Sequence, residues 1–185
     1  MRQRASWYFD GYKRIEEDGP DGKKGGRLVY VGEWYGFPGG RAEMNGIKKK
    51  TLFLSVVCFL ACFYAQFHPS AGGMVHWLAI PSLLSLVPMM YMVIGFVNFL
   101  PAKEKWEIRV YYAGYRRLYR SSVTALVFLG VWLLMEIGFI VLNPGEISGE
   151  LKYLAAVAVG TGALAVQVYL MHFHPVVVTE PGKTE

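Results

Sequence analysis

Charged residues are scarce over most of this 185-residue chain, and their scarcity is the first clue to its class. Residues 1–50 hold 11 of the 19 Lys and Arg residues and 7 of the 14 Asp and Glu residues. Beyond them, all charges but one occur in short clusters between long apolar runs. A soluble domain of this size would spread its charges along the chain. This segregation argues against a water-soluble protein and favours one that spans a membrane.

Motifs that carry chemistry are also lacking. The sequence has no glycine-rich phosphate loop, no zinc-binding helix motif and no Ser/His/Asp set with local support. Its two cysteines, Cys58 and Cys62, are one helical turn apart inside an apolar run, and their spacing differs from the Cys-x-x-Cys of thiol oxidoreductases. We therefore expect buried structural cysteines, no catalytic residues, no cofactor and no metal site.

Four apolar runs are present, each about as long as a bilayer core requires, which is about 20 helical residues with a range of roughly 17–25. Helices that are apolar on all sides would leave no polar face for water, which disfavours buried helices of a soluble protein. The predicted fold is an all-α membrane protein, a bundle of four transmembrane helices. The predicted spans are about 51–67, 77–100, 123–142 and 153–173.

The basic residues predict the orientation of these spans. The loop 101–120 carries six Lys and Arg residues, whereas the loop 68–76 carries none and the loop 143–152 carries one. Basic residues concentrate on the cytoplasmic side of membrane proteins. We therefore expect a multi-pass protein of the cell membrane with both termini in the cytoplasm. The net charge of +5 then reflects topology and attraction to lipid headgroups, and nucleic-acid binding is not expected.

Residues 1–50 have the pattern of a small cytoplasmic β-rich segment. Aromatic and β-branched residues lie on both sides of the turn-rich stretch 18–26, which predicts a hairpin or a three-stranded meander. The stretch Tyr30–Gly36 resembles the start of a MORN repeat, but such units act as arrays and a single copy implies no function. The predicted organisation is a segment 1–50, a helical domain 51–174 and a cytoplasmic tail 175–185.

An interfacial amphipathic helix is predicted at about 105–120, running into the third span. Its tyrosines recur at helical spacing and its arginines occupy another part of the helix surface. This helix would anchor the chain at the membrane surface or dock a cytoplasmic protein. The residues expected to make these contacts are Arg109, Arg116, Arg117, Tyr112 and Tyr115.

The fourth span is rich in small residues. Ala156/Gly160 and Ala158/Gly162 are pairs four residues apart, a spacing that lets helix backbones approach closely. We expect this surface to pack inside the bundle, with a homo-oligomer through the same helix as the alternative.

Glu136 is the only charged residue in the run Val123–Leu142. It lies about 20 Å along the helix from Val123, in the outer half of the membrane. An ionisable group at membrane depth costs roughly 2.5–3.5 kcal/mol on insertion scales and is a functional hypothesis by default. Glu136 is either a proton- or cation-responsive carboxyl or a structural one. The candidate partners expected at its depth are Lys152, Tyr64, Ser85 and Thr161.

Two functions follow from this sequence. The first is a non-enzymatic membrane protein that acts as an anchor, assembly or regulatory component of a membrane complex. The alternative is a proton-coupled transporter of ions or small molecules that uses Glu136. Four helices rarely enclose a pathway alone, so the alternative requires an oligomer.

Overall fold

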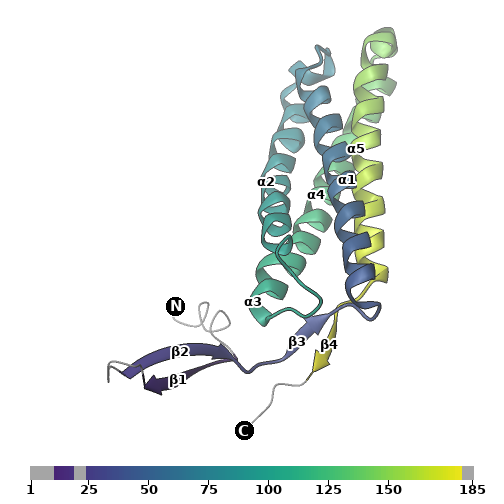
Figure 1. Cartoon of the computed structure of the whole chain (residues 1–185). Coiled ribbons are helices and arrows are strands. Elements are labelled where there is room, and N and C mark those ends of the chain that lie inside the picture. The colour runs from purple at the N-terminus through teal and green to yellow at the C-terminus, as the bar shows by residue number, and fades with distance from the viewer. Residues whose placement is uncertain (1–10, 19–23, 181–185) are drawn as a thin grey trace.

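The computed structural model describes residues 11–18 and 24–180, which form four long helices with short strands at one end (Figure 1). Each of these helices is long enough and apolar enough to cross a membrane, which confirms the predicted set of four such helices. In the most apolar 18-residue stretch of each helix, only 22% to 44% of the residues are buried inside the bundle. Most of these apolar residues therefore have surface that faces outward. The long helices are α1 (Gly40–Phe67), α2 (His76–Phe99), α4 (Arg117–Leu142) and α5 (Ile147–Phe173).

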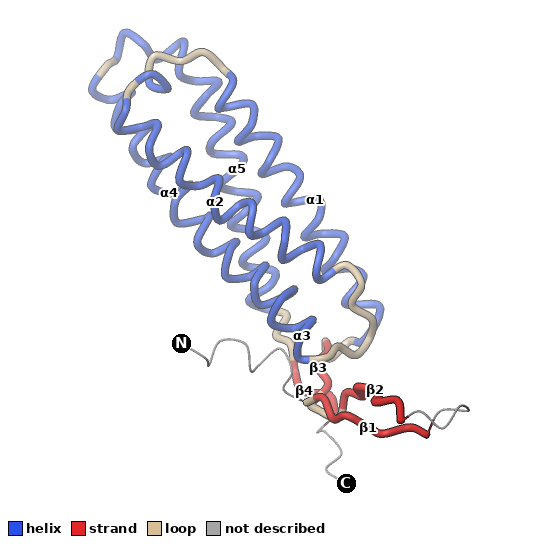
Figure 2. Tube along the Cα trace, turned by 90° about the vertical axis from the view of Figure 1, so that its left-hand side faces the viewer, coloured by secondary structure: helices blue, strands red, loops and turns tan. Residues whose placement is uncertain are grey.

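The four long helices run alongside one another in a single bundle (Figure 2). They pack in the order α1, α5, α4, α2, and α1 has little contact with α2. Two glycines allow close approach. A Cβ added at Gly95 of α2 would lie 2.7 Å from the backbone nitrogen of Leu118 in α4. A Cβ at Gly160 of α5 would lie 3.1 Å from Sγ of Cys62 in α1. The Ala156/Gly160 surface therefore packs inside the chain, whereas Gly162 is exposed.

Helix α1 begins at Gly40, well before the apolar run that predicted the first span. Gly40 has a φ of +62°, a left-handed conformation that favours glycine. The Glu43 carboxylate accepts a hydrogen bond from the Gly39 N–H at 2.6 Å, which satisfies a free donor at the helix start. Hydropathy missed this part because its first turns are polar on the outside, although Met44 and Ile47 are buried.

The predicted interfacial helix is not a separate element. A short helix α3 (Ile108–Val110), a π-helical segment (Tyr111–Arg116) and α4 follow one another without a break. A Cβ at Gly114 of the π-helical segment would lie 3.0 Å from the backbone nitrogen of Phe99, so the segment packs tightly on the end of α2. Ala113, Gly114 and Tyr115 are buried while Arg109 is exposed, so one side of the segment packs on the bundle and the other remains accessible.

Within residues 11–18 and 24–180, four short strands form two sheets. Strands β1 (Tyr12–Asp18) and β2 (Lys24–Tyr30) make an antiparallel hairpin. Strand β3 (Trp34–Gly36) pairs antiparallel with β4 (Val177–Glu180), so the chain after α5 returns to the segment before α1. We call this end of the molecule the sheet end (Figure 1). The opposite loop end carries the connections 68–75 and 143–146.

Candidate functional site

Two buried carboxyl groups meet at the loop end of the bundle. Glu136 lies on α4 and is 0% exposed, and Glu150 lies in the first turn of α5 and is 1% exposed. The backbone N–H of Gly72, in the 68–75 connection, donates a hydrogen bond to Oε1 of Glu150 at 3.0 Å. A Cβ added at Gly72 would lie 3.3 Å from each oxygen of Glu136, so this carboxyl group crowds the same glycine.

Their shared contact with Gly72 places the two carboxyl groups next to each other. Within the described part of the chain, three of their four oxygens have no hydrogen-bond partner: both oxygens of Glu136 and Oε2 of Glu150. A buried polar group without a partner carries a large desolvation cost, and for a charged group that cost is larger. These three oxygens therefore mark the least satisfied place in the bundle.

Sequence reasoning missed Glu150 because it counted that residue as part of an outer loop. Helix α5 begins at Ile147, so Glu150 is already helical. A signal was present, since Glu150, Tyr153 and Val157 recur at the three- and four-residue spacing of one helix face, and all three are buried. Glu150 is thus the first member of the buried face of α5.

Tyr153 connects the carboxyl pair to a cavity. Its hydroxyl accepts a hydrogen bond from Nε1 of Trp132 at 3.1 Å, and it lies near enough to interact electrostatically with both carboxyl groups. Tyr153 also lines a cavity of about 290 Å³ at the loop end, together with His68 and Ser82. The pair is therefore one side chain away from a space with polar walls.

None of the partners predicted for Glu136 is hydrogen-bonded to it, because neither Glu136 oxygen has a partner in the described chain. Lys152 is exposed, and Tyr64 is half exposed, with its ring stacked on His68 at a centroid distance of 5.3 Å. The hydroxyl of Ser85 donates to the carbonyl of Ser82 at 2.6 Å, and that of Thr161 donates to the carbonyl of Val157 at 2.8 Å. Serine and threonine in helices often bond back to their own backbone, so matching depth alone did not identify neighbours.

A separate polar network lies inside the bundle, nearer the sheet end than the loop end. Oε1 of Gln167 on α5 accepts from the hydroxyl of Ser55 on α1 at 2.9 Å. Nε2 of Gln167 donates to the hydroxyl of Ser122 on α4 at 3.0 Å. All three residues are buried, and their hydrogen bonds satisfy one another, so this network joins three helices and needs no ligand.

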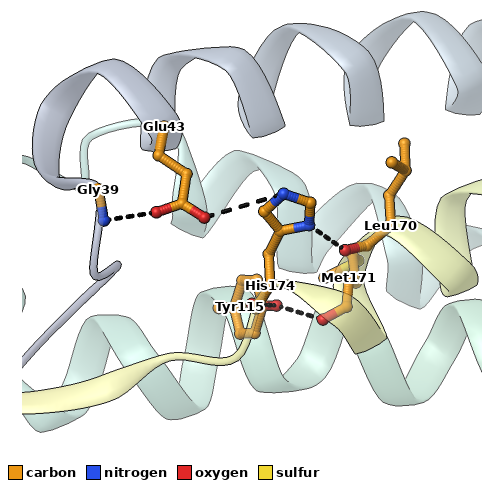
Figure 3. Close-up of polar contacts among 6 residues, drawn as sticks. All are labelled: Gly39, Glu43, Tyr115, Leu170, Met171 and His174. Atoms are coloured by element: carbon orange, nitrogen blue, oxygen red, sulfur yellow. Dashed lines mark hydrogen bonds and ion pairs between the residues drawn. The ribbon is translucent and has the colours of Figure 1, made fainter.

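The sheet end joins the start of α1 to the end of α5 (Figure 3). Nε2 of His174 lies 3.8 Å from Oε1 of Glu43, and Nδ1 of His174 is 2.8 Å from the Leu170 carbonyl. The Tyr115 hydroxyl donates to the Met171 carbonyl at 2.9 Å or the His174 carbonyl at 3.0 Å. Tyr115 is buried, which corrects its expected role as a surface contact, because its hydroxyl serves the open carbonyls of a helix end.

The other predicted surface residues remain accessible in part. Arg109 is exposed and Arg117 is half-buried. The Arg116 guanidinium lies 4.7 Å from the centre of the Tyr112 ring, a cation–π contact. These side chains stay at the sheet end, on the segment that leads into α4.

A cavity of about 630 Å³ also opens at the sheet end, between the start of α1 and the loop 101–107. The Lys48 ammonium fixes this loop by donating to the carbonyls of Leu100 at 2.8 Å and Ala102 at 2.6 Å. The polar side chains that line the cavity are Arg41, Asn45, Lys103, Glu104 and Lys105.

The remaining candidate residues are the two cysteines and the possible metal ligands. Cys58 and Cys62 are free thiols, fully buried on the side of α1 that meets α5. Among the described residues, no group of three or more His, Cys, Asp or Glu side chains gathers in a metal-binding arrangement.

No protein-family model, curated protein or solved structure matches this chain, so the proposal for its function rests on its own residues.

Proposed function

We propose that this chain is a non-enzymatic component of a membrane complex, which it anchors, assembles or regulates through its sheet end. The cavity between α1 and the loop 101–107 carries this proposal, because Arg41, Lys103 and Lys105 all line it. Of the described residues that line it, Glu104 alone is acidic. A cavity with this charge suits an acidic side chain or segment of a partner protein, which the positive field would also attract and orient.

The sheet end is a suitable platform for a partner because several parts of the chain brace it. Trp106 and Tyr35 exchange backbone hydrogen bonds at 2.7 and 2.9 Å, which ties the loop 101–107 to β3. The rings of Tyr35 and Tyr111 stack at a centroid distance of 4.5 Å. A partner would therefore meet a preformed surface and would pay little ordering cost.

The proposal also puts the sheet end in the cytoplasm, with the chain as a multi-pass protein of the cell membrane. The basic loop 101–120 and the start of α1, with Lys48, Lys49 and Lys50, both belong to this end, and such residues favour the cytoplasmic side. The segments before α1 and after α5 pair as β3 and β4, so both would be cytoplasmic. Anionic lipid headgroups on that side add attraction for the arginines on the segment leading into α4.

Charge reversal tests the proposal. The full-length double variant Arg41→Glu/Lys103→Glu reverses two walls of the cavity, and Lys152→Glu at the loop end is the matched control. We expect recovery of crosslinked partner from native membranes to fall about tenfold with the double variant, equivalent to about 1.4 kcal/mol of binding free energy. Equal recovery with both variants, at matched expression and insertion, would remove the cavity as the docking surface.

The transporter alternative is favoured by one observation, the three unpartnered oxygens of Glu136 and Glu150. It requires an oligomer, for which the exposed Ala158 and Gly162 on α5 offer a small-residue surface. Proton flux into vesicles that contain the purified protein distinguishes this alternative from the anchoring function.

A further inference from the structure

The carboxyl pair at the loop end poses a charge problem that holds for either function. Glu136 and Glu150 are fully buried and both lie against Gly72, whose N–H is 3.0 Å from Oε1 of Glu150 and whose added Cβ would be 3.3 Å from each Glu136 oxygen. Two neighbouring ionised carboxylates repel each other strongly in a medium of low dielectric constant, and burial also removes the hydration of each. A folded chain keeps such a pair only when something neutralises part of its charge.

The surrounding elements supply no positive side chain among the described residues. The 68–75 connection contributes the Gly72 N–H, which already serves Glu150. Helix α2 contributes the apolar side chain of Leu78, which lies against Gly72. On α5 the neighbouring titratable group is Tyr153, and on α4 the indole N–H of Trp132 is already donated to Tyr153.

We propose that Glu136 and Glu150 form a proton-binding site, in which one proton is held between a Glu136 oxygen and Oε2 of Glu150. Uptake of this proton changes the charge of the pair from −2 to −1 and turns an unpartnered oxygen into a donor. Glu150 Oε1 keeps the Gly72 N–H and Glu150 Oε2 becomes the acceptor. The shared proton therefore satisfies both carboxyl groups and lowers their repulsion.

The donor set favours a proton over a metal cation. Calcium takes about six to eight oxygen ligands, and magnesium takes six in a strict octahedron. The pair offers three unpartnered oxygens from two side chains. Two carboxyl groups that share one proton need only a single contact between them, as in other paired carboxyl sites.

The pair lies near a cavity through which a proton could reach it, and it contacts a loop that its charge would affect. The cavity of about 290 Å³ reaches Tyr153, and the polar side chains of His68 and Ser82 also line it. The pair also joins α4, α5 and the 68–75 connection through Gly72. Loss of the proton would drive the carboxylates apart and loosen this connection from the bundle, which makes the loop end responsive to pH.

Infrared spectroscopy of the full-length protein in lipid nanodiscs tests the site by following the stretching band of protonated carboxyl groups. We expect such a band at neutral pH, its loss in Glu136→Gln, and a shift in its frequency in Glu150→Gln, because the acceptor changes from a carboxylate to an amide. Glu146→Gln, which alters an exposed carboxyl at the same end, should leave the band unchanged.

Several results would overturn the proposal. One is the absence of a protonated band in the unaltered protein at neutral pH, which requires no variant to fold. Another is an unchanged band in both Glu136→Gln and Glu150→Gln. Loss of the band on addition of Na⁺ or Ca²⁺ at constant pH would replace the proton with a metal cation as the resident ligand. A band frequency that depends on Glu136 alone would reduce the site to one isolated acid.

Discussion

At the sheet end, the Tyr115 hydroxyl, the Lys48 ammonium and the Glu43 carboxylate all bind backbone groups left open at helix termini. At the loop end, by contrast, Glu136 and Glu150 leave three buried oxygens without a partner in the described chain. Buried polar groups are nearly always paired in folded proteins. The first arrangement is what a structural joint requires, and the second has a cost that a structural joint would avoid.

The two ends therefore differ in role: one contributes stability, and the other can respond to pH or to a ligand. The sheet end leaves one neutral hydroxyl, that of Thr51, buried without a partner in the described chain, whereas the loop end leaves three carboxyl oxygens. Paired polar groups favour one low-energy arrangement, but a group with an uncompensated charge can be shifted by a ligand or by pH. Local rules of folding tend to be broken at functional sites and compensated elsewhere. On this argument the sheet end holds the molecule together and the loop end senses its surroundings.

Removal of the central aromatic side chain of the sheet end should have the largest effect. Trp106 is buried, its indole N–H bonds the Lys103 carbonyl, and its ring contacts those of Phe37 and Phe99, both at centroid distances of 5.1 Å. We expect Trp106→Ala to lower the free energy of unfolding by about 3–5 kcal/mol, as for other buried aromatic residues.

Trp77→Ala is the matched control at the loop end, because Trp77 is 41% exposed. It should cost well under half as much, with both variants measured by unfolding in detergent. A larger loss for Trp77 than for Trp106 would reverse the assignment of stability to the sheet end.

Loss of a single hydroxyl group tests the joint more finely. Tyr115→Phe removes the donor that serves the carbonyls of Met171 and His174 at the end of α5. We expect unfolding to become easier by about 1–3 kcal/mol, because buried acceptors are left unpaired. Tyr64→Phe alters a half-exposed tyrosine of α1 and should change stability little. An equal effect of the two changes would mean that the hydroxyl of Tyr115 contributes nothing specific.

The smallest effect concerns the hairpin β1–β2, which Tyr12 holds to the sheet end by donating to the Glu107 carboxylate. Burial, followed by this hydrogen bond, raises the pKa of Tyr12 from 10.0 to about 12. A raised tyrosine pKa means that the docked state binds the proton more tightly. Its contribution to docking is therefore complete below pH 10.0 and is lost as the pH rises toward about 12.

Titration of carbon-labelled tyrosine by NMR measures this pKa directly, with Tyr12→Phe to assign the signal. In Glu107→Gln the midpoint should fall below that of the unaltered protein and stay above 10.0, because burial is the larger cause. Glu104→Gln, an exposed carboxyl nearby, is the control. A midpoint that does not move in Glu107→Gln would show that Glu107 does not hold the hairpin.

The sequence predicted the four long apolar helices because hydropathy is a property of each segment alone. It did not predict the start of α1 at Gly40, where the helix is polar outside and only Met44 and Ile47 turn inward. It also treated the segment that leads into α4 as a surface helix, although Tyr115 is buried against the end of α5. In both places the deciding contacts come from residues far away in the chain.

Composition and the spacing of charge thus determined that this chain has four span-length apolar helices, that one of them carries Glu136, and that its basic residues gather on a few segments. Tertiary structure alone decided that the neighbour of Glu136 is Glu150 and not Lys152, and that β4 returns to pair with β3. The reason is that hydrophobicity fixes which segments avoid water, whereas the rotation and depth of each packed helix fix which polar groups meet.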